Sequence, residues 1–285
     1  MTIKLQAPAK INLALDVTGK LSNGYHTLST IMQSISLFDI VTISESNTGL
    51  ISVETSNSEI PSHKQNIAYK AAELFIQKTN IKHNGLNIII QKNIPTEAGL
   101  GGGSTDAAAI LIGLNHIFRT SFSSVELRDM SSYIGADVPF CIVGGTKICT
   151  GIGEIITEAP ELEQCYIVIA KGYSGISTKI AFDKIDAVGF NFSPNFNKYN
   201  GSINSIKEIG YNRFESVTDD FNIKYIKSKM YEFDADYSSM TGSGSAVFGL
   251  FKNPTQAEKC AFFFNKNNYF SYLCTPITTG SCIIY

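Results

Sequence analysis

The first seventeen residues alternate between apolar and polar side chains. Positions 3, 5, 7, 9, 11, 13, 15 and 17 are all apolar, and most positions between them are polar. A period of two predicts a half-buried strand with one face in the core. Lys10 and Asn12 lie on the polar face. Because Pro8 has no N–H group, we expect this strand to lie at a sheet edge, to contain a bulge, or to break there.

Similar patterns predict helices and strands along the whole chain. In the first half we expect a hairpin over 39–46 and 49–55, a helix over 66–79, a strand over 86–91, an apolar and therefore buried helix over 105–118, a helix over 124–134 and an extended segment over 136–140. In the second half we expect a hairpin over 144–153, a strand over 165–171, a helix over 219–233, a glycine loop and strand within 238–251, and a final helix and strand. This mixture indicates α+β architecture. The length favours two lobes, and we place their division at 1–158 and 159–285.

Composition narrows the classes of partner. The net charge is -2 and the sequence pI is near 6.1, so we expect no nucleic-acid partner. No apolar run is long enough for a membrane span, and the first residues carry no targeting signal, so we expect a cytoplasmic protein without a membrane partner. The six cysteines form no C-x-x-C pair and the four histidines show no zinc spacing, which gives no support to a metal centre.

A glycine-rich loop leads directly into the apolar helix. Its glycines expose backbone N–H groups and permit turns with positive φ, and the positive end of the following helix favours an anion. We therefore expect the loop to bind the phosphates of ATP. The predicted ATP-binding residues are Pro95, Thr96, Glu97, Ala98, Gly99, Leu100, Gly101, Gly102, Gly103, Ser104 and Thr105.

Two commoner nucleotide motifs do not fit this loop. A Walker loop needs a lysine before its final Ser or Thr, and a dinucleotide-binding motif needs a third glycine where Ser104 or Asp106 stands. The alternative is a glycine turn before a buried helix, with no ligand. The order strand, glycine loop, helix favours the phosphate site.

Lys10 and Asp137 are candidates for chemistry, and each has a structural alternative. Lys10 either holds an anion from a partly buried strand or extends to solvent at a sheet edge. Asp137 either caps a local turn or orients a hydroxyl group for reaction. If the two side chains meet beside the glycine loop, the lysine keeps the carboxylate ionised, and the pair suits phosphoryl transfer from ATP with Mg²⁺ on the phosphates.

Tyr25 and His26 follow Gly24 in a predicted turn and present an aromatic ring beside an imidazole. Such a pair is suited to stack on a planar base and to hydrogen-bond it.

Four motifs occur in an order that resembles the GHMP kinase superfamily. They are Pro8-Ala-Lys-Ile-Asn12, the loop and helix over 99–109, Gly135-Ala-Asp-Val-Pro139 and Thr241-Gly-Ser-Gly244. The resemblance implies an amino-terminal lobe like domain 2 of ribosomal protein S5 and a ferredoxin-like carboxy-terminal lobe. It implies that Asp137 is the base and Lys10 its charge partner, and that ATP and Mg²⁺ are required. A monomer or weak homodimer is expected.

The Gly-Tyr-His turn resembles one branch of that superfamily, whose acceptor is 4-diphosphocytidyl-2-C-methyl-D-erythritol. The implied reaction is phosphorylation of its 2-hydroxyl group by ATP, in the non-mevalonate pathway to isoprenoid precursors. The resemblance assigns the cytidine end to Asn12, Tyr25, His26, Thr178 and Phe182, and a phosphate or substrate loop to Thr241, Gly242, Ser243 and Gly244.

One departure from the superfamily pattern stands at Arg213, where a carboxylate is usual, so no role is assigned to it, and the metal ligands stay unassigned. Two other functions remain open at this point. The same fold could phosphorylate a different alcohol, or it could bind a nucleotide without catalysis.

Overall fold

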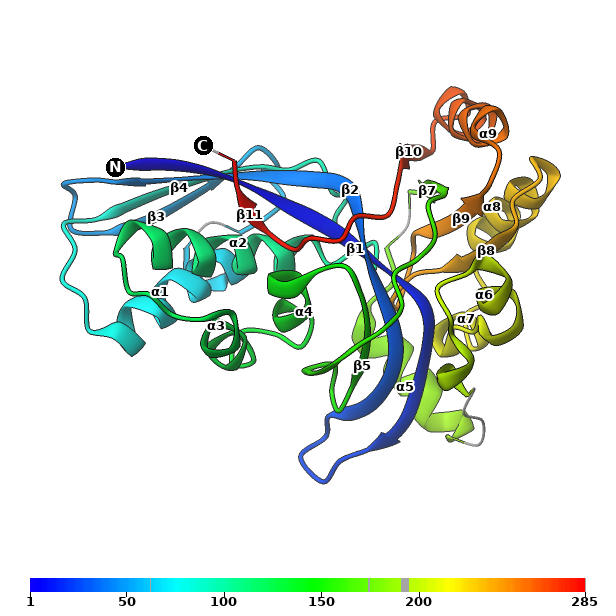
Figure 1. Cartoon of the computed structure of the whole chain (residues 1–285), viewed down its shortest axis with the longest axis horizontal. Helices are drawn as coiled ribbons and strands as arrows, with labels where there is room; N and C mark the ends of the chain where they lie inside the picture. The colour runs from blue at the N-terminus through cyan, green and yellow to red at the C-terminus, as the bar shows by residue number, and fades with distance from the viewer. Residues whose placement is uncertain (62, 174, 191–194, 285) are drawn as a thin grey trace.

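Two long antiparallel strands run through the whole molecule. The structure is a computed structural model that describes residues 1–61, 63–173, 175–190 and 195–284. Figure 1 shows β1 (Thr2–Lys20) and β2 (His26–Glu45), which both belong to the larger sheet, bending where they pass the smaller one. The site described below is built around this pair.

The larger sheet has seven strands. Its order is β11-β1-β2-β4-β3, and the hairpin of β5 and β6 joins it at β2. The other strands are β3 (Ile51–Thr55), β4 (Leu86–Gln91), β5 (Thr146–Thr150), β6 (Ile155–Glu158) and β11 (Cys282–Ile283). The predicted hairpin over 39–55 is wrong, because β4 lies between β2 and β3 and pairs with both. Alternation indicates which face of a strand is buried, but not which strand fills its hydrogen-bonding edge.

A layer of helices covers one face of this sheet (Figure 1). They are α1 (Ile67–Thr79), α2 (Gly102–Ile117), α3 (Ser124–Ser131) and α4 (Val138–Val143). The helix α2 is buried along most of its length, as its apolar sequence predicts. The extended segment expected over 136–140 is wrong, because α4 begins there. Pro139 stands in the first turn of α4, where its missing N–H group would have no partner within the helix.

Burial on both faces distinguishes β1 from the half-buried strand that its alternation predicts. Every residue from 7 to 17 is buried, including Lys10, Asn12 and Asp16. One face packs on the smaller sheet, with Ile11 in the same core cluster as Ile167. The pairing with β2 shifts register after Pro8, so of the three outcomes expected for this proline the bulge is confirmed.

The smaller sheet is antiparallel, in the order β10-β7-β9-β8. Its strands are β7 (Tyr166–Lys171), β8 (Tyr237–Met240), β9 (Val247–Phe251) and β10 (Phe270–Cys274). The helices in this half are α5 (Thr178–Val188), α6 (Ile203–Ile209), α7 (Arg213–Ser216), α8 (Phe221–Glu232) and α9 (Pro254–Lys266), and 3₁₀ turns occupy His63–Gln65 and Phe196–Lys198. In the described ranges every helix is too short or too polar to cross a bilayer. The division after residue 158 stays a prediction.

Candidate active site

The first glycine loop (residues 99–103) and the second glycine loop (residues 241–244) contact each other and β1. Leu100 accepts a hydrogen bond from the backbone N–H of Lys10 at 3.0 Å. Gly99 has φ +71°, and a Cβ atom there would lie 2.1 Å from the carbonyl oxygen of Thr241. Only glycine fits so close an approach of two backbones. The first loop is therefore fixed between β1 and the second loop.

The N-terminus of α2 is open to a ligand. Gly101, with φ +72°, stands at the N-cap, and no side chain caps the helix. The N–H groups of the first turn and the positive helix end are thus available to an anion. Thr105 lies one turn further along, and its buried hydroxyl group is 3.2 Å from that of Ser281. The predicted loop is well suited to phosphate, but the Thr105 side chain faces the core.

Lys10 and Asp137 meet at the start of α4. The Lys10 Nζ atom lies 3.3 Å from Oδ2 of Asp137 and donates to Oδ1 of Asn12 at 2.7 Å. The Lys10 side chain is 5% exposed, so it does not extend to solvent. Asp137 is the N-cap residue of α4, yet its side chain makes no capping hydrogen bond. Both structural alternatives are therefore wrong, and the carboxylate, 29% exposed, is accessible beside the glycine loop.

Asn12 connects three parts of the site. Its Oδ1 atom accepts from Lys10 and from the N–H of Gly242, at 3.0 Å, and its Nδ2 atom donates to Thr30. Its backbone N–H donates to the hydroxyl group of Thr241 at 3.0 Å. The Asn12 side chain thus holds Lys10 and the second loop in place, and its predicted contact with cytidine stays a prediction.

A cavity of 910 Å³ opens on these residues. It extends from the Lys10 and Asp137 pair to the turn before β2. The predicted site residues that line it are Lys10, Asn12, Tyr25, His26, Glu97, Gly99, Gly101, Ser104, Asp137, Thr178, Phe182, Gly242, Ser243 and Gly244. The structure thus brings together in one space the predicted catalytic pair, the start of α2 and the predicted cytidine contacts.

The aromatic residues of this cavity are partly packed on one another. The rings of His26 and Phe182 stack with centroids 4.3 Å apart, and Phe214 meets Phe182 edge-on at 4.9 Å. No space for a base therefore exists between His26 and Phe182, whereas Tyr25 is 60% exposed. Thr178 on α5 reaches the second loop, with its Oγ1 atom 2.9 Å from Oγ of Ser243.

A second cavity, of 260 Å³, lies on the other side of the glycine loop. Thr55, Asn66 and Ile67 line it together with Lys92 and Asp106. The predicted loop residues that line it are Pro95, Thr96, Glu97, Ala98, Gly99, Leu100, Gly101, Gly102 and Gly103. Of the residues predicted from the sequence, Thr105 and Thr241 line neither cavity.

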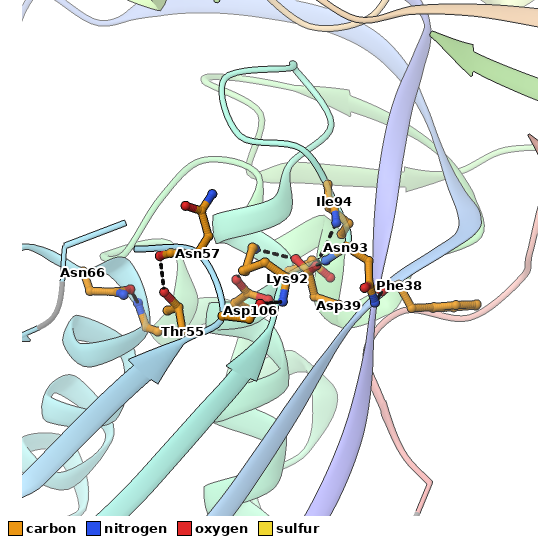
Figure 2. Close-up of polar contacts among 12 residues, drawn as sticks. Phe38, Asp39, Thr55, Asn57, Asn66, Lys92, Asn93, Ile94 and Asp106 are labelled. Atoms are coloured by element: carbon orange, nitrogen blue, oxygen red, sulfur yellow. Dashed lines mark hydrogen bonds and ion pairs between the residues drawn. The ribbon is translucent and has the colours of Figure 1, made fainter. Parts of the chain in front are cut away.

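Lys92 joins two buried carboxylates beside this second cavity (Figure 2). Its Nζ atom donates to Oδ2 of Asp39 and, at 2.6 Å, to Oδ2 of Asp106. The other oxygen of Asp39 accepts from the backbone N–H groups of Asn93 and Ile94 at 2.6 and 2.9 Å. The cluster therefore connects β2, the entry to the glycine loop and the second turn of α2.

This cluster has one cation for two carboxyl groups. Burial raises the pKa of Asp106 to about 8; Lys92 opposes the shift, and Asp39 adds to it through its charge and a side-chain hydrogen bond. Burial lowers the pKa of Lys92, but the two carboxylates outweigh it and the net pKa is raised. Asp39 accepts three hydrogen bonds, from the Lys92 ammonium and from two backbone N–H groups. Asp106 therefore holds a proton that an exposed aspartate would lose.

Sequence reasoning did not find Asp39, Asp106 or Lys92 as a cluster. Lys92 stands directly before the loop, which is a local signal, but its partners come from β2 and α2.

Arg213, the departure from the superfamily pattern, donates to Tyr211 and to the carbonyl of Gly189, so it has a structural role. Within the described residues, no three histidine, cysteine or acidic side chains gather as a metal site.

Comparisons with known proteins agree with this geometry. Residues 66–145 match the GHMP kinases N terminal domain and residues 221–269 match the GHMP kinases C terminal domain. The 4-diphosphocytidyl-2-C-methyl-D-erythritol kinase of Caldicellulosiruptor bescii is 44% identical over 91% of this chain and 93% of its own length. The enzyme of the same name from Alkaliphilus metalliredigens is 41% identical over 90% of each chain. A crystal structure of 4-(cytidine 5'-diphospho)-2C-methyl-D-erythritol kinase superposes with a TM-score of 0.81 at 26% identity, covering 96% of this chain and 99% of that one.

Proposed function

The chain belongs to the 4-diphosphocytidyl-2-C-methyl-D-erythritol kinase family of the GHMP kinases, and we propose that it phosphorylates that compound. The reaction transfers the γ-phosphoryl group of ATP to the 2-hydroxyl group, giving the 2-phosphate and ADP, as a step towards isoprenoid precursors. The cytoplasmic location and the monomeric or weakly dimeric state stay predictions.

The observation that carries this proposal is the Lys10 and Asp137 pair in the cavity that also holds Tyr25 and His26. Asp137 accepts the proton of the 2-hydroxyl group as its oxygen attacks the γ-phosphorus atom, and ADP leaves. Lys10 balances the carboxylate charge and, through Asn12, stays aligned with the second loop. Positioning and charge balance do most of the work in such a transfer.

ATP fits between the two cavities. The N-terminus of α2 and the N–H groups of the glycine loop are suited to the phosphates. The second cavity lies against the same loop and is lined by apolar Ile67 and Ile94 and by polar Asn66, which suits a planar base. Its 260 Å³ is ample for an adenine ring.

Mg²⁺ fits the donors of the main cavity. This ion keeps several waters and binds one or two protein oxygens together with the phosphates, so it needs no cluster of carboxylates. Ser104 and the carboxylate of Glu97 line the cavity and would hold it. When bound, it neutralises the charge of the phosphate oxygens.

The direct test is ADP release by the purified protein with Mg-ATP and 4-diphosphocytidyl-2-C-methyl-D-erythritol, with homoserine, mevalonate and galactose as rival acceptors. We expect turnover with the cytidine compound alone. Turnover with a rival would keep the kinase chemistry and overturn the substrate. ATP binding without turnover on any acceptor would favour the non-catalytic alternative.

Substitution at Tyr25 separates these outcomes further. The exposed ring contacts only the cytidine end in this proposal, so Tyr25→Ala should raise KM for the cytidine compound about tenfold or more, as expected for one lost stacking contact. The KM for ATP should not change. Tyr173→Ala is a matched control, because that tyrosine is 81% exposed and lines neither cavity.

A further inference from the structure

A row of three charged or polar side chains connects α5 to the strands that precede and follow the Gly-Tyr-His turn. Asp186 on α5 places Oδ1 2.7 Å from Nε2 of His26 and Oδ2 2.5 Å from Nζ of Lys20. Lys20 ends β1 and His26 begins β2. Phe182, one helical turn before Asp186, stacks on the same imidazole. His26 is therefore held on its face and at one nitrogen by a single helix.

The contact with Asp186 decides which nitrogen of His26 carries hydrogen. Hydrogen bonds from Lys20 and then His26 lower the pKa of Asp186, so its carboxylate is ionised and only accepts. Nε2 must then donate. In the imidazole tautomer that carries its hydrogen on Nε2, the other nitrogen, Nδ1, is an acceptor.

Nδ1 is the atom left for a ligand. His26 lines the main cavity, and within the part of the chain that the structure describes Nδ1 has no hydrogen-bond partner. An acceptor at this point matches a base that presents an N–H group. Cytosine presents an exocyclic amino group where uracil presents a carbonyl oxygen. The same acceptor therefore attracts one base and repels the other at that edge.

We propose that Asp186 is a positioning residue for base specificity, which fixes His26 with hydrogen on Nε2 so that Nδ1 selects the amino group of cytosine. This inference rests on the proposed function, because it takes the base to be the cytosine of the substrate. Asp186 itself does not touch the substrate in this scheme. Lys20 holds the second carboxylate oxygen and so fixes the direction of the first.

The test is Asp186→Asn. The asparagine amide can donate to Nε2, which favours the opposite tautomer with hydrogen on Nδ1. We expect kcat/KM for the cytidine substrate to fall roughly ten- to hundredfold, as for one unmade buried hydrogen bond, mostly through KM. The matching uridine compound should lose less or gain, so the cytidine-to-uridine ratio falls. The ¹⁵N resonances of His26 should show hydrogen moving from Nε2 to Nδ1.

Asp183→Asn is the matched control, because Asp183 is an exposed carboxylate on the same helix and outside the main cavity. It should change neither the ratio nor the resonances. An equal loss for both bases in Asp186→Asn, or unchanged resonances, would overturn the inference and leave Asp186 a structural contact.

Failure of this inference is distinguishable from failure of the proposed function. If the wild-type protein does not phosphorylate the cytidine compound, the proposed function fails at that step. Binding of CDP against UDP to the wild type and to Asp186→Asn then still tests base selection. Equal affinities of the wild-type protein for CDP and UDP would overturn it.

Discussion

Two lysines flank the same glycine loop, and their surroundings differ in a way that separates chemistry from support. Lys10 faces one carboxylate, Asp137, which is open to a cavity of 910 Å³. Lys92 faces two carboxyl groups, those of Asp39 and Asp106, which are almost fully buried. The first pair is exposed enough to meet a hydroxyl group. The second group, Lys92 with Asp39 and Asp106, is closed to solvent. In it, Asp39 accepts hydrogen bonds from the backbone N–H groups at the entry to the glycine loop.

The comparison teaches that a charged side chain beside the glycine loop can have either of two uses. A charge that reacts must be reachable and must have only the partners that align it. A charge that supports must be paired with an opposite charge, because an unpaired buried charge is strongly destabilising. We therefore expect substitutions at the first pair to change catalysis and substitutions at the second to change stability.

The largest expected effect is that of Asp137→Asn on catalysis. The amide keeps the shape but cannot accept the hydroxyl proton, so kcat should fall about 10²- to 10⁴-fold, the usual range for a general base. ATP affinity and thermal unfolding should stay close to wild type. Steady-state ADP release measures kcat, and calorimetry measures ATP affinity and thermal unfolding. Asp129→Asn, at an exposed position of α3, is the control. An undiminished kcat would remove Asp137 from the chemistry.

The next effect sets Lys92→Met against Lys10→Met. Removing Lys92 leaves two buried carboxyl groups without a cation and should lower the free energy of unfolding by about 3–5 kcal/mol. Removing Lys10 leaves Asp137 partly hydrated and should cost only about 1 kcal/mol, while kcat falls. Urea unfolding and ADP release, measured on both variants, give the comparison. Equal losses of stability would mean that the two lysines are not specialised in this way.

The smallest effect, taken per pH unit, is the pH dependence caused by Asp106. Its pKa is raised to about 8 from 3.8, so between these values the folded state binds one more proton than the unfolded state. Stability from this group is therefore present at low pH and lost as pH rises, on the order of 1 kcal/mol per pH unit. Asp106→Asn should remove this slope between pH 5 and 8 in urea unfolding. Parallel curves for the variant and wild type would show that Asp106 does not hold the proton.

The sequence predicts individual helices and strands well, but it predicts poorly which strands lie next to each other in the sheet. The strand over 86–91 and the helix over 66–79 appear almost at their predicted bounds, because alternation and helical spacing are local signals. The hairpin over 39–55 failed because β4 enters between its strands. The segment at 136–140 failed because a proline is tolerated in a first helical turn.

In the candidate site too, some residues could be predicted from the sequence and others could not. The glycine loop and the Lys10 and Asp137 motifs are readable, since each is a short run of residues. The partners that position them are not, because Asn12 meets Thr241 across 229 positions and His26 meets Asp186 across 160. Such contacts follow from the path of the backbone, which the residue types near His26 do not reveal.

The pairing of β11 with β1 has a consequence for how the protein is made. Gln6 pairs with Cys282, and Thr105 meets Ser281, so the sheet that bears Lys10 takes its edge strand from residues translated long after it. The hydrogen bond that Asn12 accepts from the N–H group of Gly242 likewise forms only after residue 242 has been made. During synthesis on the ribosome, β1 and β2 must remain without these partners, and Lys10 gains its alignment with the second glycine loop only after residue 242 has been made. We therefore expect activity to appear late in translation, and nascent chains that stall before residue 281 should be inactive even though the first glycine loop is already complete.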